Sequence, residues 1–474
     1  MLAIRRLFLR LLGLVYLVAF ASLGVQIAGL IGSRGILPVG ELLGWAEQQV
    51  GPARFWLLPT LLWLGSSDAA LQALCWGGAL LAVLLILDVA PALVLALLWT
   101  GYLSLASVGQ VFLGYQWDAL LLETGLLAIL VAPLRLGRRA ERDAEPSRLA
   151  VFLVRFLLFR LMFSSGAVKL LSGDPSWRTL AALRVHYETQ PIPAWTSWFA
   201  HQLPPSFQSF SCLAMFVCEL AVPFLALGSR RARLWGFFPL VGLQLLIAAT
   251  GNYAFFNWLT IALCVLLLDD AALPQRLFPA PSAPGPGRTW PRSVLWPAAG
   301  LYLLLSLGHL AFTFGIAPPA PVLGLMRLAA PFDAVNSYGL FAVMTTTRPE
   351  IIVEGSEDGV NWLDYEFKWK PGDVNRAPAF VAPHQPRLDW QMWFAALGVC
   401  ESNPWFVRFL ERLREGSPPV LELLARDPFP SRPPRYLRSV VYDYRFTRAG
   451  AEAWWRRERQ GPYCPELGPG PESP

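Results

Sequence analysis

Long apolar segments, separated by short polar connections, fill the first two thirds of the chain. About 20 consecutive apolar residues cross the hydrocarbon core of a bilayer as a helix, and several segments approach or exceed that length. They cover residues 11–31, 70–87, 91–112, 117–133, 150–171, 207–227, 234–250, 253–268 and 294–316. The pattern predicts an α-helical multi-pass membrane bundle of about nine transmembrane helices over residues 1–317, with a polar outer-face loop at 172–206.

The pattern changes beyond Pro318 to short segments of alternating polarity. Segments rich in β-branched and aromatic residues predict strands at 349–354, 362–370 and 436–447, the first two joined by the turn GSEDG. Other segments predict helices at 388–397, 405–414 and 420–426. We therefore expect a C-terminal, extracytoplasmic, β-rich α+β domain over residues 318–465 and a disordered tail at 466–474.

The composition agrees with a chain whose main solvent is membrane lipid. Hydrophobic residues make up 55% of the 474 residues and charged residues only 15%. The formal charge of +6 comes from Arg residues beside apolar segments, where they act as orientation signals rather than as a nucleic-acid surface. We therefore predict no nucleic-acid partner.

The distribution of Arg predicts the orientation of the bundle. With Met1 in the cytoplasm, alternation through the spans brings the Arg-rich segments 135–148, 230–233 and 276–292 to the cytoplasmic side. The same alternation brings the loop at 172–206 and everything after Pro318 to the opposite side. The loop and the C-terminal domain are thus expected to share a compartment, the lumen or the periplasm.

The cysteines predict neither a metal site nor a cofactor. The chain has six, with no CxxC pair and no spacing typical of zinc ligands. Four lie in apolar segments as small core residues: Cys75, Cys212, Cys218 and Cys264. Only Cys400 and Cys464 are candidates for a disulfide.

Charged residues within the predicted spans are functional candidates, because charge is costly in hydrocarbon. They are Asp118, Glu123, Arg160, Lys169 and Glu219. One interpretation is two interhelical salt bridges, with Asp118 near Lys169 at the outer end and Glu123 near Arg160 deeper in the bundle. The alternative is a polar cavity that opens toward the outer face.

Such a cavity would lie beneath His186 and Glu188, which with Lys169 are the acid/base candidates if the chain is an enzyme. The same two residues precede TQPIP, whose prolines require extended backbone, so hydrogen bonding within the loop is the structural alternative. The sequence contains no GxSxG, HExxH, Walker or GxGxxG motif. We predict no catalytic residues and retain a membrane enzyme as the alternative.

Several segments identify a family. WRTLAALRVHYETQPIPAW at 177–195, CELAVPF at 218–224 and GNYAFFNWLT at 251–260 resemble the lipase maturation factor family. VEGSEDGVNW at 353–362, YEFKWKPGDVNRAP at 365–378 and APHQPRLDWQMWFAALG at 382–398 resemble it too. The loop that carries the family signature contains Trp177, Arg178, His186, Tyr187, Glu188, Gln190 and Pro191.

The resemblance implies a multi-pass protein of the endoplasmic reticulum membrane that helps secreted lipases, such as lipoprotein lipase, to fold and assemble. It also implies that the lumenal domain holds the client. The chain is shorter than animal members and has no N-x-S/T sequon in its expected lumenal parts, which suits a compact or bacterial relative in an inner membrane. A weaker likeness to the membrane part of vitamin K-dependent carboxylases sustains the enzyme alternative.

A client-binding surface needs exposed apolar side chains. In the segment 389–397, Trp390, Trp393, Phe394 and Leu397 recur at helical spacing and form an apolar stripe. Trp390, Trp393 and Phe394 are the candidate client-facing residues, and a helix packed on the domain's own sheet is the alternative. The pair at 454–455 is a candidate for the membrane interface.

Overall fold

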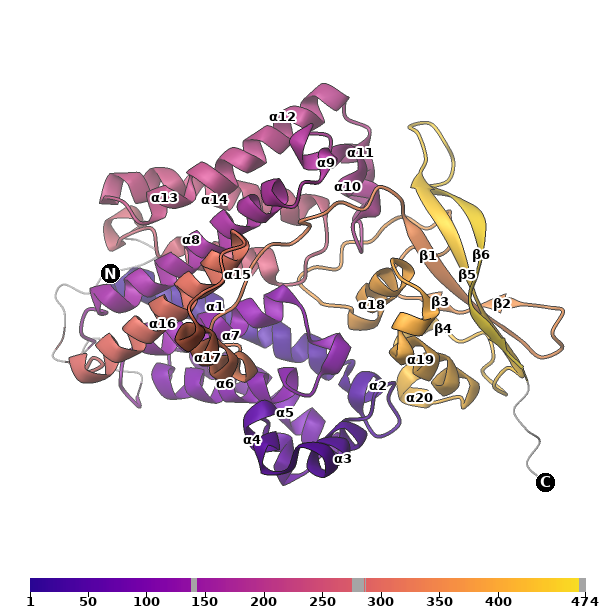
Figure 1. The fold of residues 1–474 in the computed structure, drawn as a ribbon, viewed down its shortest axis with the longest axis horizontal. Helices are drawn as coiled ribbons and strands as arrows, with labels where there is room; N and C mark the ends of the chain where they lie inside the picture. Colours follow the sequence, from indigo (N-terminus) through magenta and orange to yellow (C-terminus); the bar gives the residue numbers. More distant parts are fainter. Residues whose placement is uncertain (138–142, 275–284, 286, 469–474) are drawn as a thin grey trace.

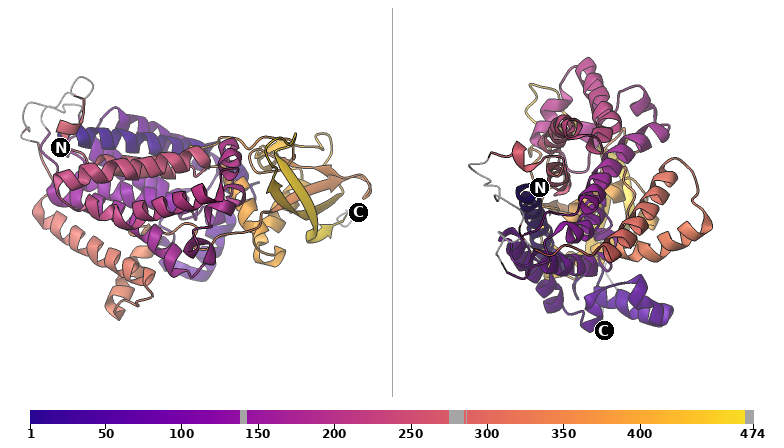
Figure 2. Two further views of the ribbon diagram at one scale, coloured as in Figure 1. Left: turned by 90° about the horizontal axis from the view of Figure 1, so that it is seen from above. Right: turned by 90° about the vertical axis from the view of Figure 1, so that its left-hand side faces the viewer.

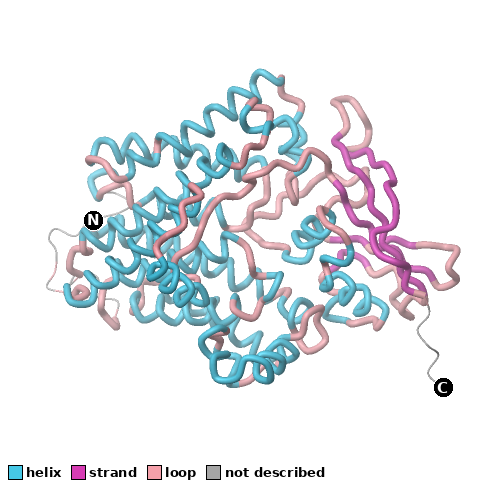
Figure 3. The backbone as a smooth tube through the Cα atoms, in the orientation of Figure 1, coloured by secondary structure: helices cyan, strands magenta, loops and turns pink. Residues whose placement is uncertain are grey.

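The structure, a computed structural model, describes residues 1–137, 143–274, 285 and 287–468. Its long helices lie side by side in a bundle, and the strands gather at one end of that bundle (Figures 1 and 3). Seen from above, the helices run toward the end that carries the C-terminal domain (Figure 2). The molecule is thus a helical bundle with a β-containing cap at one end.

Six helical segments in the described part of the chain are long and apolar enough to cross a membrane. They are α1 (Leu2–Gly24), α5 (Asp68–Ile86), α8 (Arg148–Leu171), Pro205–Ala226, α14 (Arg230–Thr250) and α16 (Arg292–Thr313). Three other predicted spans are shorter helices: α6 (Pro91–Ala106), α7 (Gln116–Val131) and α15 (Phe256–Val265). At 1.5 Å per residue these reach at most about 24 Å, less than the hydrocarbon thickness of about 30 Å.

The remaining helices connect and cap the bundle. They are α2 (Ile27–Ile31), α3 (Val39–Val50), α4 (Arg54–Leu57), α9 (Pro175–Arg178), α10 (Leu183–Thr189), α11 (Trp195–His201), α12 (Pro205–Phe216), α13 (Pro223–Ala226), α17 (Ala320–Ala329), α18 (Arg387–Ala396), α19 (Pro404–Arg414) and α20 (Pro418–Leu421). A π-helical turn, Val217–Ala221, joins α12 to α13. The outer-face loop is therefore largely helical.

The first helix starts earlier than the apolar pattern predicts. Residues 11–31 were expected to form one span, but α1 already begins at Leu2 and includes Arg5. Arg5 is only 2% exposed, and its Nη2 donates a hydrogen bond of 2.9 Å to Asp143 Oδ2. Because this ion pair neutralises the guanidinium, a charged residue is tolerated inside the helix.

Two antiparallel sheets make up the β structure. The larger has the order β2-β1-β5-β6, and the smaller pairs β3 with β4. The strands are β1 (Pro349–Ser356), β2 (Leu363–Asp364), β3 (Glu366–Phe367), β4 (Leu424–Arg426), β5 (Tyr436–Phe446) and β6 (Trp455–Leu467). β1 and β5 pair in continuous register from Pro349 opposite Asp443 to Ser356 opposite Tyr436.

The sheets differ from the sequence prediction in three places. The expected strand at 362–370 is divided between β2 and β3, which belong to different sheets. The expected helix at 420–426 ends early, and its last residues form β4. The edge strand β6 was not predicted, and Trp455 in it is only 2% exposed and stacks on Phe446 at 4.3 Å between ring centroids. Trp455 is therefore a core residue rather than a membrane anchor.

β6 extends through Leu467, so residues 466 and 467 belong to a strand and not to a tail. Residues 469–474 of the expected tail lie outside the described residues, as do 138–142, 276–284 and 286 of the expected Arg-rich segments. One continuous buried apolar cluster includes residues of both the bundle and the C-terminal domain, for example Phe112 and Trp405, whose ring centroids are 5.8 Å apart. The two parts therefore share a core.

Cys400 and Cys464, the two candidates for a disulfide, are bonded to each other, and the bond ties the segment after α18 to β6 across 64 residues of sequence. C464A is expected to lower the free energy of unfolding by about 2–5 kcal/mol, because the unfolded chain loses a long-range constraint. Thermal unfolding of the purified chain measures the effect. C218A, which removes a free cysteine, is the control. Equal midpoints for C464A and the parent chain would contradict the expectation.

Candidate functional site

An ion pair joins the bundle to the C-terminal domain. Arg387, the first residue of α18, donates from Nη1 to Asp118 Oδ2 at 2.9 Å and from Nη2 to Asp118 Oδ1 at 2.8 Å. Tyr102 OH also donates to this carboxylate. Both ions are almost fully buried, and two-point pairing of Arg with a carboxylate is among the stronger charge-assisted arrangements. The α18 N-terminus is thereby anchored inside the bundle.

Neighbouring polar contacts reinforce this junction. Ser22 Oγ, on α1, accepts from the backbone N–H of Gln385 at 2.9 Å. Gln26 Oε1 accepts from the backbone N–H of Arg387 at 2.9 Å, and Trp393 Nε1 donates to the carbonyl of Thr189 at 3.0 Å. The family segment at 382–398 therefore contacts both α1 and the signature loop.

The expected pairing of Asp118 with Lys169 is wrong. Lys169 Nζ instead pairs with Glu219, at 2.9 Å to Oε1 and 2.7 Å to Oε2. Glu219 lies on the π-helical turn, whose irregular geometry turns a side chain out of the α-helical register. The partner of Asp118 comes instead from the C-terminal domain, 269 residues away.

The expected pairing of Glu123 with Arg160 is confirmed, at 2.7 Å between Oε1 and Nη1. Glu123 Oε1 also accepts from Tyr302 OH at 2.8 Å. Its Oε2 accepts from Tyr338 OH at 2.7 Å and from the backbone N–H of Asn336 at 2.8 Å. This carboxylate joins α7, α8, α16 and the segment after α17. Each of its oxygens accepts at least two hydrogen bonds, so its role here is structural.

The signature loop is positioned by hydrogen bonds rather than left open. Gln190 Nε2 donates to Ser197 Oγ at 3.0 Å and to the carbonyl of Thr250 at 2.8 Å. Glu188 accepts from Arg445 Nη1 at 3.2 Å and from the backbone N–H of Phe446 at 3.0 Å. Glu188 therefore connects the loop to β5, which favours the structural role over acid/base chemistry.

Arg348, just before β1, contacts the backbone of the same loop. Its Nη1 donates to the carbonyl of Glu188 at 2.7 Å and also to that of Gln190. Its Nη2 donates to the carbonyl of Pro191 at 2.8 Å and to Glu350 Oε1 at 2.7 Å. Arg348 is not among the candidates predicted from the sequence. The one sign of its role in the sequence is that an Arg directly precedes the predicted strand at 349–354.

The other signature residues differ in exposure. Trp177 is buried and donates from Nε1 to the carbonyl of Phe341 at 3.0 Å, while Arg178 is exposed. His186 Nε2 lies 2.9 Å from Tyr253 OH, and Tyr187 lines the same cavity as His186. The loop thus packs against the turn at 251–256 that follows α14.

Acidification is expected to destabilise the loop through His186. Burial, with a smaller effect from Lys169, lowers the pKa of His186 from 6.5 to about 4. The unfolded chain therefore takes up this proton at higher pH, so the stability that neutral His186 contributes is complete above about pH 6.5 and lost toward pH 4. The midpoint of thermal unfolding should fall over that range.

H186F should show a shallower fall, because it cannot take up the proton. Part of the slope should remain in H186F, since burial also lowers the pKa of His384 to about 4. Identical pH profiles for H186F and the parent chain would contradict the assignment to His186.

The apolar stripe of α18 is mostly packed. Trp390 and Trp393 are 3% and 6% exposed, so neither is client-facing in this conformation. Trp390 packs on Trp117 of the bundle at 4.7 Å between ring centroids, and α18 also contacts β1 of the domain's own sheet. Phe394 is 45% exposed and is the one of the three that a client can reach.

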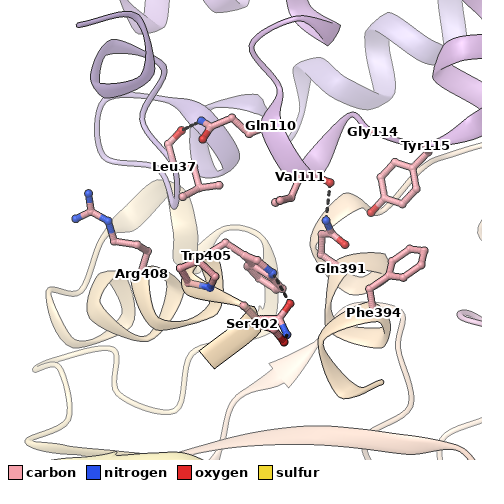
Figure 4. A pocket seen from close by; sticks show the side chains of 12 residues that line it. Leu37, Gln110, Val111, Gly114, Tyr115, Gln391, Phe394, Ser402, Trp405 and Arg408 are labelled. Atoms are coloured by element: carbon pink, nitrogen blue, oxygen red, sulfur yellow. Dashed lines mark hydrogen bonds between the residues drawn. The ribbon is translucent and has the colours of Figure 1, made fainter. Parts of the chain in front are cut away.

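Phe394 lines a cavity of about 670 Å³ where the bundle meets the C-terminal domain (Figure 4). Tyr115, Trp405 and Arg408 line it as well, and Arg408 is 45% exposed at its side chain. Gln391 donates from Nε2 to the carbonyl of Val111 across the cavity. The cavity combines aromatic rings with an exposed guanidinium, a composition typical of protein-binding sites.

In the described part of the chain, no group of three His, Cys, Asp or Glu side chains is arranged to hold a metal ion. Many buried ions are instead paired with one another, among them Asp118 with Arg387 and Glu123 with Arg160. Membrane-length helices, buried ion pairs and a disulfide-bonded cap define a polytopic membrane protein whose extramembrane domain is built into the end of its bundle.

The chain belongs to the lipase maturation factor family. The model of the lipase maturation factor transmembrane domain matches residues 3–275, and that of the lipase maturation factor C-terminal domain matches residues 334–465. Together they cover both parts of the structure, as the resemblance in the sequence implied.

Curated relatives match over nearly the whole chain. Lipase maturation factor 2 of Gallus gallus is 38% identical over 98% of this chain and 81% of that protein. Human lipase maturation factor 2 is 39% identical over 98% of this chain and 82% of that protein. Human lipase maturation factor 1 is 36% identical over 97% of this chain and 87% of that protein. These vertebrate relatives give no support to a bacterial origin. No solved structure matches.

Proposed function

We propose that this protein is a membrane-bound maturation factor that assists the folding and assembly of secreted lipases. The observation that carries the proposal is the match to lipase maturation factors 1 and 2 through both the bundle and the C-terminal domain. The role is non-enzymatic: the protein holds a client while its apolar surface is exposed.

The placement of the acid/base candidates supports this role over the enzyme alternative. Lys169 is neutralised by Glu219, and Glu188 is used by Arg445 and the backbone of β5. The buried charges join segments distant in sequence and so make the cap rigid. A rigid cap loses little entropy on binding, which favours a holding function.

The client site proposed here is the cavity around Phe394, Trp405 and Arg408. Its aromatic rings suit apolar segments that a partly folded lipase has not yet buried, and Arg408, paired with Glu41, forms the polar edge of the cavity. This replaces Trp390 and Trp393, which are buried. The client-facing surface therefore contains residues of α19 as well as α18.

The proposed topology has Met1 in the cytoplasm and the C-terminal domain in the lumen of the endoplasmic reticulum. The disulfide between Cys400 and Cys464 supports an oxidising compartment for that domain. The shorter helices α6, α7 and α15, together with the segments that flank them, complete about nine crossings with the six long ones, and membrane lipid surrounds residues 1–317. Residues 318–465 form the client-holding part.

Phe394 offers a direct test. F394E is expected to reduce crosslinking to a lipase and secretion of active lipase at least about fivefold, since a charge replaces an apolar contact. L397E is the matched control, because Leu397 is 42% exposed on the same helix end but does not line the cavity. Both are measured in cells whose lipase secretion depends on this protein. Equal activity of F394E and the parent chain would remove the cavity from the proposal.

A further inference from the structure

A second cavity, of about 320 Å³, lies within the bundle below the signature loop. Side chains of α8, α12, α14 and α15 line it. Three of its lining residues, Leu203, Phe207 and Leu246, are 40%, 51% and 67% exposed. Phe207 and Leu246 belong to membrane-length helices, where exposed apolar side chains face lipid. The mouth of the cavity is therefore open to the hydrocarbon of the membrane.

The charges in this cavity cancel. Lys169 Nζ has three donors, and they go to the carbonyl of Ser165 at 3.1 Å and to the two oxygens of Glu219. The ion pair is 7% exposed on each side. Because it has no free cationic donor and no net charge, the cavity suits an uncharged ligand.

His186 presents an unused hydrogen-bond acceptor at the cavity. Tyr253 OH has one proton, which it donates to Gln190 Oε1 at 2.8 Å. The bond between Tyr253 OH and His186 Nε2 must therefore be donated by Nε2–H, which leaves Nδ1 of the neutral ring as an acceptor. Nδ1 is buried and has no hydrogen-bond partner among the described residues. A ligand hydroxyl would satisfy it.

Gln244 presents the complementary donor. Its Oε1 accepts from Asn257 Nδ2 at 2.8 Å, whereas its Nε2 reaches only the thioether of Met162, at 3.6 Å. A thioether is a weak acceptor, so the amide N–H is open to a better one such as an ester carbonyl. Gln244 lies six residues before Thr250, the end of α14, or about 9 Å along the helix axis.

We propose that this cavity binds an acylglycerol with a free hydroxyl, taken from the surrounding membrane. The hydroxyl donates to His186 Nδ1, the ester carbonyl accepts from Gln244 Nε2, and one acyl chain leaves through the mouth at Phe207 and Leu246. Phe207 and Leu246 both lie near the loop-side ends of α12 and α14, so the glycerol end stays close to the loop and the acyl chain enters the lipid from the side. The site is separate from the client cavity at Phe394.

Equilibrium binding to the full-length protein in nanodiscs tests the proposal, with 1-oleoylglycerol as the probe. Methyl oleate lacks the hydroxyls, and the ether analogue 1-O-oleylglycerol lacks the ester carbonyl, so each is expected to bind about three- to tenfold more weakly, the effect of one neutral hydrogen bond. H186F should weaken 1-oleoylglycerol to the level of methyl oleate. Equal binding of either analogue would overturn the assignment of the ligand.

Two further variants leave His186 unchanged, so they test lipid binding without the risk that H186F misfolds the loop. S211W places a large ring at a lining position and should abolish binding, whereas F210W places the same ring on the same helix outside the lining and should leave it unchanged. Loss of binding in both, or in neither, would place the lipid elsewhere and overturn the proposal. Lipase secretion is measured in parallel for S211W and F210W. A loss of lipid binding can then be told apart from the loss of client binding that F394E is expected to cause.

Discussion

D118A is expected to lower the free energy of unfolding by about 3–5 kcal/mol, because it leaves the guanidinium of Arg387 buried without its counter-ion. Arg387 is 1% exposed, and the remaining acceptors near it are the carbonyl of Phe112 and the hydroxyl of Tyr102. The pair joins the bundle to α18, so separation of the two parts should precede complete unfolding. Limited proteolysis and thermal unfolding of the purified full chain measure both effects.

E41A is the matched control for D118A. Glu41 also pairs across the two parts, with Arg408, but the side chains are 55% and 45% exposed. An exposed pair contributes at most about 1 kcal/mol, so E41A should be nearly neutral. If E41A lowers the free energy of unfolding as much as D118A does, burial of the ion pair does not determine how much its loss destabilises the protein. The double variant D118L/R387L should recover part of the stability, since it removes both buried charges.

E123A is the second change with a large expected effect, again about 3–5 kcal/mol of unfolding free energy. The substitution leaves Arg160 without its counter-ion and removes the acceptor for Tyr302, Tyr338 and the backbone of Asn336. Unsatisfied groups in a low-dielectric interior carry their full desolvation cost. Thermal unfolding, together with the amount of protein in the membrane, measures the loss.

T124V tests whether E123A acts through its polar contacts rather than through disturbance of α7. Thr124 is the next residue, is fully buried, and its hydroxyl has no hydrogen-bond partner among the described residues. Replacing that hydroxyl by a methyl group should leave stability unchanged or raise it slightly. A loss in T124V comparable to that in E123A would contradict the role assigned to the carboxylate. Protease access to the segment at 333–346 should increase in E123A only.

The local pattern predicted the features that depend on local physics. Apolar length located the helices, since a bilayer requires about 20 residues per span. Exclusion of the cysteines within apolar segments left Cys400 and Cys464 as the candidates for a disulfide, and the neighbouring spans predicted the pair of Glu123 and Arg160. The signature segments predicted the family. Each of these inferences uses only composition, spacing or the order of spans.

The edge strand β6 shows where the pattern is insufficient. Its sequence, WRRERQGPYCPEL, has four consecutive charged residues and contains Gly461 and Pro462, which disfavour a strand interior. As an edge strand it pairs with a neighbour on one side only, and charge on such a strand is tolerated because it prevents aggregation. Nothing local separates this segment from a solvated loop.

The bundle, the β-containing C-terminal domain and the family could be predicted from the sequence, because hydrophobic length, alternation and motif order are properties of short segments. The partners of the buried charges Asp118 and Lys169, and the disulfide, became known only from the folded structure. Asp118 meets Arg387 across 269 residues and Lys169 meets Glu219 across 50, and Trp390 is buried against the bundle. Each of these contacts depends on how distant segments pack, since the shared core forms only when the cap docks on the helices.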